Sequence, residues 1–132
     1  MQTHQIYLIG GDDDEVAIFT EGRFEASCVL TCEYRGKQIK AIESDFFEAL
    51  CVIRKEMAKE NLIPFCYGAS LNVFPSRMSR GMAAGKVAYK MEMRIPATKD
   101  QIVGIFKQGP DVMPATVELQ KEYFDEWLLS LV

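Results

Sequence analysis

Histidine is scarce in this chain, and its scarcity limits the chemistry that the sequence can support. His4 is the only imidazole among 132 residues, although histidine is the commonest general acid or base near neutral pH. A serine or cysteine nucleophile needs such a base beside it. His4 would therefore have to fold back onto a thiol such as Cys28 or Cys32. No recognisable catalytic motif is present, so we expect no enzymatic activity, no catalytic residue and no cofactor.

The cysteines are the next residues whose type could do chemistry. They are Cys28, Cys32, Cys51 and Cys66. Cys28 and Cys32 lie in an alternating segment typical of a strand, where residues four apart are separated by about 13 Å. A disulfide requires Cα atoms within about 7 Å, and no Cys-x-x-Cys or Cys/His cluster has zinc spacing. We expect buried free thiols and no metal site, with a cysteine-dependent enzyme as a rival hypothesis.

Acidic residues form the only dense charge run. Asp12, Asp13, Asp14 and Glu15 follow two glycines, but an EF-hand calcium loop would need a glycine where Ala17 stands. The chain carries a formal net charge of −4, and residues 67–98 hold five basic side chains against one acidic. Nucleic-acid binders usually carry a basic stripe on a basic domain. We therefore expect no nucleic-acid partner, because an acidic surface is better suited to a basic protein.

The elements that would position these residues begin with strands. Short strands are predicted over 4–10 and 15–20, separated by a turn. Residues 24–34 alternate between apolar and polar side chains, which indicates one half-buried strand. Arg35-Gly36 predicts a tight turn into a strand over 37–42.

Helices and strands mix in the rest of the chain. Asp45 and Glu48 have capping-box spacing for a helix over 46–60. Pro75-Ser76 could start a short helix through Ala84, and residues 86–95 alternate like a strand. Thr98 and Gln101 predict a short helix ending before Gly109. A last helix is expected from Thr116 to about Leu131, with Val117, Phe124, Trp127, Leu128 and Leu131 on its core face.

These patterns together predict an α+β fold, with an antiparallel sheet of about four to five strands and three to four helices packed on it. The length suits a single globular domain spanning 1–132. No apolar run approaches the roughly 18 residues of a membrane span, and the first residues lack a signal-peptide pattern. We expect a cytoplasmic protein with no membrane partner.

Two stretches of the second half resemble a known class of protein. "YGASLNVFPSRMSRGMAAGKVAYKM" and "GPDVMPATVELQKEYFDEWLLSL" resemble small bacterial proteins encoded beside polymorphic toxins, in particular the immunity proteins of contact-dependent growth-inhibition systems. The resemblance covers residues 64–131 and is one of overall pattern, without a catalytic signature. It implies a cytosolic antitoxin that binds a cognate toxin domain, such as a nuclease, and blocks its active site or a neighbouring surface.

Surface carboxylates are the candidate toxin-binding groups, since they could pair with lysine and arginine in a toxin cleft. The candidates are Asp12, Asp13, Asp14 and Glu15, then Glu25 and Glu33 on the polar face of the long strand. The alternative is a small-molecule or peptide binding module with a pocket lined by methionine and aromatic side chains. The residues favour no particular oligomeric state.

Overall fold

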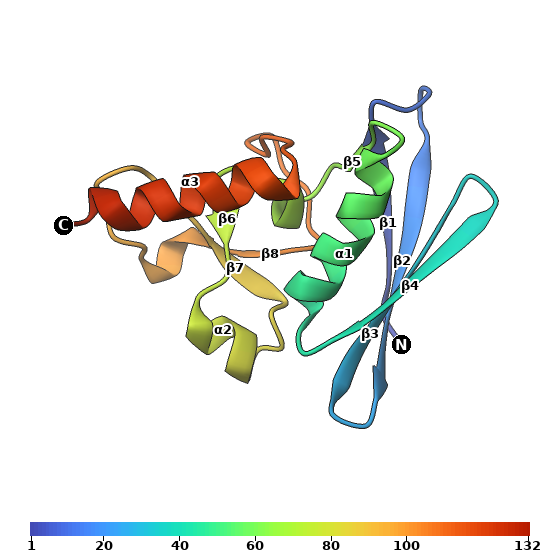
Figure 1. Ribbon diagram of the computed structural model, residues 1–132, viewed down its shortest axis with the longest axis horizontal. Helices are drawn as coiled ribbons and strands as arrows, with labels where there is room; N and C mark the ends of the chain where they lie inside the picture. The colour runs from blue at the N-terminus through green and yellow to red at the C-terminus, as the bar shows by residue number, and fades with distance from the viewer.

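Five antiparallel strands form the larger sheet of the molecule, which the computed structural model describes over residues 1–132 (Figure 1). The strand order is β4-β3-β2-β1-β5. The strands span Thr3–Ile9 (β1), Val16–Phe24 (β2), Ser27–Tyr34 (β3), Lys37–Glu43 (β4) and Ile63–Pro64 (β5). The first four follow one another as hairpins, because each short connection returns the chain beside the strand before it.

One face of this sheet, the inner face, packs on a helix. Alternation along the strands places Phe19 and Leu30 on the inner face, where both are fully buried. Helix α1 (Phe46–Ala58) lies across this face and buries Leu50 and Ile53 against it (Figure 1). Asp45 caps the helix by accepting a hydrogen bond from the Glu48 amide at 2.8 Å. The helix therefore starts where the strand pairing ends and seals the core.

A second, smaller sheet stands beside the first. Its order is β6-β7-β8. Its strands span Val73–Phe74 (β6), Val87–Lys90 (β7) and Ile102–Gly104 (β8). Helix α3 (Val117–Ser130) runs along this sheet and carries the C-terminus away from the larger one, while α2 (Arg77–Met82) lies below it (Figure 1). All three α-helices thus lie on one side of the larger sheet (Figure 1).

A buried arginine connects helix α1 to the segments around the smaller sheet. Arg54 on α1 is 3% exposed and has no carboxylate partner. Its guanidinium donates to the carbonyls of Gly68 and Ala115 at 3.0 and 2.9 Å and to Gln120 Oε1 at 2.7 Å. The Gln120 amide nitrogen lies 2.9–3.0 Å from the same Gly68 carbonyl oxygen and from two further ones, those of residues 70 and 73. Burial lowers the pKa of Arg54, and carbonyl dipoles replace a counter-ion.

The structure confirms the α+β class, with three α-helices and the extra small sheet. The hairpin at Arg35-Gly36 is present, with φ of 51° and 74° as a two-residue turn of type I′ requires. The helices capped by Asp45, Ser76 and Thr116 also begin where predicted. All cysteines are buried and free.

The predicted strand over 24–34 is wrong at its start. Phe24 ends β2, and Glu25 and Ala26 form a tight turn in which Glu25 has a φ of 54°. Glu25 therefore lies in a turn and not on the polar face of a strand. The prediction failed because alternation continues through the turn, and neither turn residue is Gly, Asn, Asp or Pro.

Two further element boundaries and the core face of α3 also differ from the prediction. The strand predicted over 86–95 is only β7, and the helix predicted over 98–109 is a single 3₁₀ turn at Lys99–Gln101 followed by β8. Pairing of β8 with β7 overrides the local helix signal. On α3, Trp127 is buried as expected, whereas Leu128 and Leu131 are exposed. The buried position that sequence analysis missed is Gln120.

Candidate functional site

The acidic run occupies the turn between β1 and β2. Asp12, Asp13 and Asp14 are exposed there. Glu15 is different, because it accepts from Arg35 Nε and Nη2 at 2.5 and 3.0 Å. This hydrogen bonding lowers the pKa of Glu15 to about 2. Three of the four carboxylates are thus free to meet a partner, and the fourth ties two hairpin turns together.

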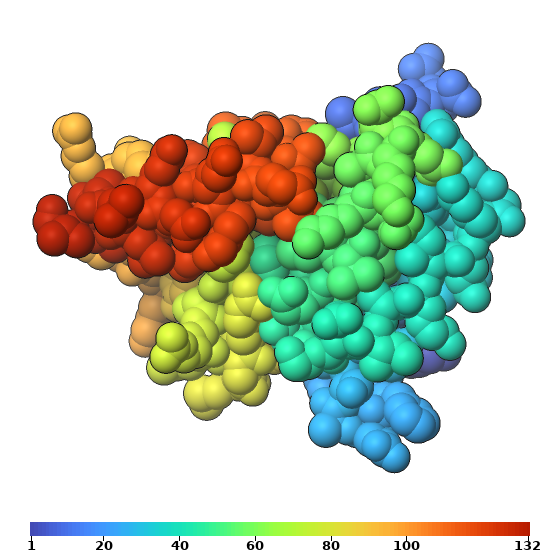
Figure 2. Space-filling view, in the orientation of Figure 1, coloured from blue at the N-terminus to red at the C-terminus, as the bar shows by residue number.

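The other two predicted acidic residues lie apart from each other. Glu33 is exposed on β3 and accepts from Gln38 Nε2 at 3.1 Å, near the end of the sheet that carries the acidic run. Glu25 lies at the opposite end, about 30 Å away along the nine residues of β2. Figure 2 shows the β1–β2 and β2–β3 turns as projections at opposite ends of the molecule. The structure therefore brings five of the six predicted residues to one end and leaves Glu25 at the other.

The face of the larger sheet opposite α1 has no helix on it; we call it the outer face (Figure 1). Its central positions come from alternate residues of three strands: Thr20, Gly22, Phe24, Val29, Thr31, Glu33, Gln38, Lys40 and Ile42. Two large apolar side chains on it are well exposed, with Phe24 63% and Ile42 52% accessible. An exposed apolar area rimmed by polar residues is typical of a binding surface.

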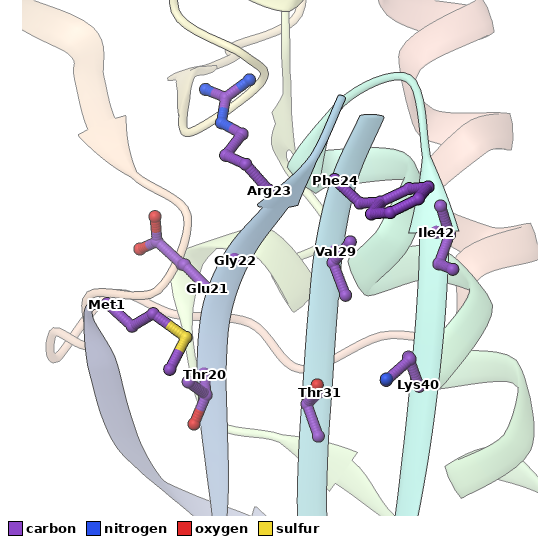
Figure 3. Close-up of a pocket in the computed structure, with 10 residues that line it drawn as sticks. All are labelled: Met1, Thr20, Glu21, Gly22, Arg23, Phe24, Val29, Thr31, Lys40 and Ile42. Atoms are coloured by element: carbon purple, nitrogen blue, oxygen red, sulfur yellow. The ribbon is translucent and has the colours of Figure 1, made fainter. Parts of the chain in front are cut away.

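A hollow of about 560 Å³ indents this face towards the β2–β3 turn (Figure 3). Its lining residues are Met1, Thr20, Glu21, Gly22, Arg23, Phe24, Val29, Thr31, Lys40 and Ile42. Gly22 leaves the floor without a side chain, and a Cβ there would lie 3.7 Å from the Val29 carbonyl oxygen and 3.9 Å from Met1 Sδ. Both are ordinary contacts, so a larger residue at position 22 would fill the hollow without displacing the backbone.

Glu21 lies at one side of this hollow and shares the inner face of the sheet with its cross-strand neighbour Leu30. It is 6% exposed and lies 2.6 Å from His4 Nε2 and 2.8 Å from Lys86 Nζ. Burial alone raises the pKa of Glu21, but its hydrogen bonds with Lys86 and His4 outweigh that effect and the net pKa is lowered. The His4 ring also stacks on Phe106 at 4.5 Å between centroids. The single imidazole thus anchors strand β1, and its hydrogen bond goes to a carboxylate and not to a nucleophile.

The thiols are in environments that suppress nucleophilicity. Burial raises the pKa of Cys32 to about 12 and that of Cys66 to about 11. Burial likewise raises the pKa of the other two cysteines. No three His, Cys, Asp or Glu side chains are grouped so that they could hold a metal ion. The arrangement on the outer face can bind a partner through shape and charge.

A second depression lies between α3 and the small sheet. It encloses about 320 Å³ and is lined by Phe74, Pro75, Ser76, Tyr89, Met91, Pro96, Ala97, Phe124, Trp127 and Leu131. Phe74 and Phe124 stack at 4.0 Å between ring centroids, and Trp127 Nε1 donates to the Ile95 carbonyl at 3.0 Å. This aromatic cleft is the kind of pocket that the alternative reading, a small-molecule module, requires.

The apolar centre of the outer face was not predicted, because charge alone does not indicate it. A strand that carries apolar residues on both of its faces indicates that the second face is also a contact surface, and Val29 and Ile42 are such residues on the outer face.

No protein-family model and no curated protein matches this chain. None of its helices has the length and apolar character needed to cross a bilayer.

Proposed function

We propose that this chain is an immunity protein that binds a cognate toxin domain one to one in the cytoplasm and blocks its activity. The observation that supports the proposal best is the outer face of the larger sheet. No helix covers this face, and Phe24 and Ile42 are exposed there around a hollow. Protein interfaces combine such an apolar centre with a polar rim. Phe24 and Ile42 would be the anchors of the complex.

The acidic turn would then act on the rate of association. Asp12, Asp13 and Asp14 project from one end of the sheet, and an exposed cluster of one sign attracts a basic partner before contact. Rim charges of this kind mainly change the association rate, whereas desolvated groups change dissociation. The two sets of residues should therefore have separable kinetic effects.

Co-expression with the toxin domain encoded immediately upstream of the gene tests the proposal. The wild-type chain should restore growth and co-purify with the toxin domain at a one-to-one ratio. Ile42→Ala should speed dissociation, and the triple change Asp12→Asn, Asp13→Asn and Asp14→Asn should slow association. Leu129→Ala, which truncates a side chain 75% exposed on α3, is the matched control and should do neither. A wild-type chain that neither binds nor protects would refute the function.

The aromatic cleft supports a second candidate, a small-molecule or peptide binding module. Trp127 is the only tryptophan and lines the cleft, so its fluorescence would report an occupant. Native mass spectrometry of the purified protein should then show the mass of a bound ligand, and this additional mass should be absent from the Phe124→Ala variant. A spectrum of the bare chain, with Trp127 emission unaltered by candidate ligands, would remove this candidate.

A further inference from the structure

Strand β4 forms an open edge of the larger sheet. It is the last strand in the order and pairs only with β3. At the other edge β5 pairs with the end of β1, and Phe106 stacks on His4 farther along that strand. The seven residues of β4 span about 23 Å. It is thus the longest uncovered stretch of sheet edge in the molecule.

The hairpin turn determines which backbone groups of β4 are free. Tyr34 and Lys37 flank the two-residue turn and form a hydrogen-bonded pair, and such pairs alternate with non-hydrogen-bonded ones along an antiparallel ladder. The N–H and C=O groups of Gln38, Lys40 and Ile42 therefore point away from β3. No other backbone or side-chain group bonds to them. Three donors and three acceptors form a ready template for another strand.

Charge argues against a second copy of this chain as the occupant. A two-fold antiparallel pairing that uses all seven residues is centred on position 40, so it places Lys40 directly opposite Lys40. Like charges opposite each other are destabilising, and edge lysines are a common protection against self-pairing. Lys37, the only other cation of the strand, already pairs with Glu60 at 2.5 Å. Glu43, the remaining charged residue of β4, pairs with the buried Cys28 and so lies on the inner-face side. Lys40 is therefore the free charge on the outer-face side of this edge, and it favours a carboxylate from a different protein.

We propose that a segment of the toxin domain adds to β4 as a sixth antiparallel strand, with an acidic side chain opposite Lys40. This inference rests on the proposed function and deepens it. The edge is continuous with the outer face, because Lys40 and Ile42 also line the hollow. A strand added here would place its alternate side chains beside that hollow, so one partner would use both surfaces.

Hydrogen exchange of the wild-type protein, free and bound to the upstream-encoded toxin domain, tests the inference directly. Amides of Gln38, Lys40 and Ile42 should exchange fast in the free chain and at least about 100-fold more slowly in the complex, because they acquire strand hydrogen bonds. Amides of Ile39 and Ala41 bond to β3 and should be protected in both states. A complex in which the three amides stay unprotected overturns the edge inference and leaves the immunity function standing. Absence of any complex overturns both, and protection in the free chain with a dimer mass means that a second copy occupies the edge.

Two variants add an affinity readout. Lys40→Pro removes one outward N–H and no bond to β3, a position where edge strands tolerate proline, and should weaken the complex about 100-fold. Lys40→Glu should weaken it at least about tenfold through repulsion of the opposing carboxylate, whereas Lys99→Glu, an exposed charge on the 3₁₀ turn, should not. Circular dichroism and the unfolding temperature establish that each variant is folded. Folded Lys40 variants with wild-type affinity would refute the inference.

Discussion

Removal of the Gln120 side chain should cost this protein much of its stability. Gln120 is 1% exposed, accepts from the buried Arg54 guanidinium at 2.7 Å and lies within donating distance of three carbonyls. The charged hydrogen bond contributes about 2 kcal/mol and the amide bonds about 1 kcal/mol each. Truncation to Ala also leaves a cavity that costs about 1 kcal/mol. The amide nitrogen has two hydrogens and so makes two such bonds, and we therefore expect Gln120→Ala to lower the free energy of unfolding by about 5 kcal/mol, out of the 5–15 kcal/mol typical of a domain.

Urea titration and thermal unfolding measure this loss. The expected change corresponds to a fall in Tm of about 18 °C for a chain of this length. Gln120→Met keeps the volume but not the hydrogen bonds, so it should recover only about 1 kcal/mol. Glu122→Ala, which changes an exposed side chain two residues away on α3, should stay within about 0.5 kcal/mol of wild type. A loss below about 1 kcal/mol for Gln120→Ala, or full recovery by Met, would refute the view that polar contacts hold this junction together.

Three further predictions concern single interactions. The pKa of Glu15 is lowered to about 2 because of Arg35, so its contribution to stability is present above its ordinary pKa of 4.5 and is lost as the pH falls towards 2. Glu15→Gln should therefore flatten the pH dependence of the free energy of unfolding in that interval. Curves identical to those of the wild type would contradict this. Burial raises the pKa of all four thiols, that of Cys32 to about 12. They should therefore resist iodoacetamide at pH 7.5 and react in 8 M urea, as counted by mass spectrometry. Rapid labelling of one thiol in the native protein would favour the cysteine-enzyme hypothesis again. Lys86→Met leaves the buried Glu21 carboxylate with His4 as its remaining partner and should cost about 1–2 kcal/mol in urea titration, whereas a neutral result would show that the pair adds no stability.

Turns and helix starts that depend on one or two neighbouring residues could be predicted from the sequence. Arg35-Gly36 marks its hairpin because both residues adopt positive φ between alternating strands, and Asp45 marks its helix because a side-chain cap acts within one turn. Glu25 fails the same reasoning, since its turn follows from the pairing of β2 with β3 and not from a turn-forming residue. The register of the whole sheet decides that position.

Buried polar residues were beyond prediction for a related reason. Gln120 occupies a helix position that reads as surface, and the group that makes its burial favourable, Arg54, is 66 residues away in sequence. An unpaired buried guanidinium would be very unfavourable, so neither residue could be placed inside without knowledge of the other. Sequence patterns report what one residue contributes to one element, whereas this pair depends on two elements meeting.

The same distinction applies to the candidate binding surface. Asp12, Asp13 and Asp14 could be proposed from sequence because charge is a property of each residue. The free edge of β4 has no such signature, since its six unbonded groups belong to the backbone and become available only because β3 lies on one side and nothing on the other. The role that we propose for Lys40 follows from that position. On a central strand it would be an ordinary exposed lysine, whereas on an edge it would disfavour a second copy and favour an acidic partner. In the proposed complex, strand order would create the surface that discriminates among partners, and side-chain charge would determine which partner it accepts.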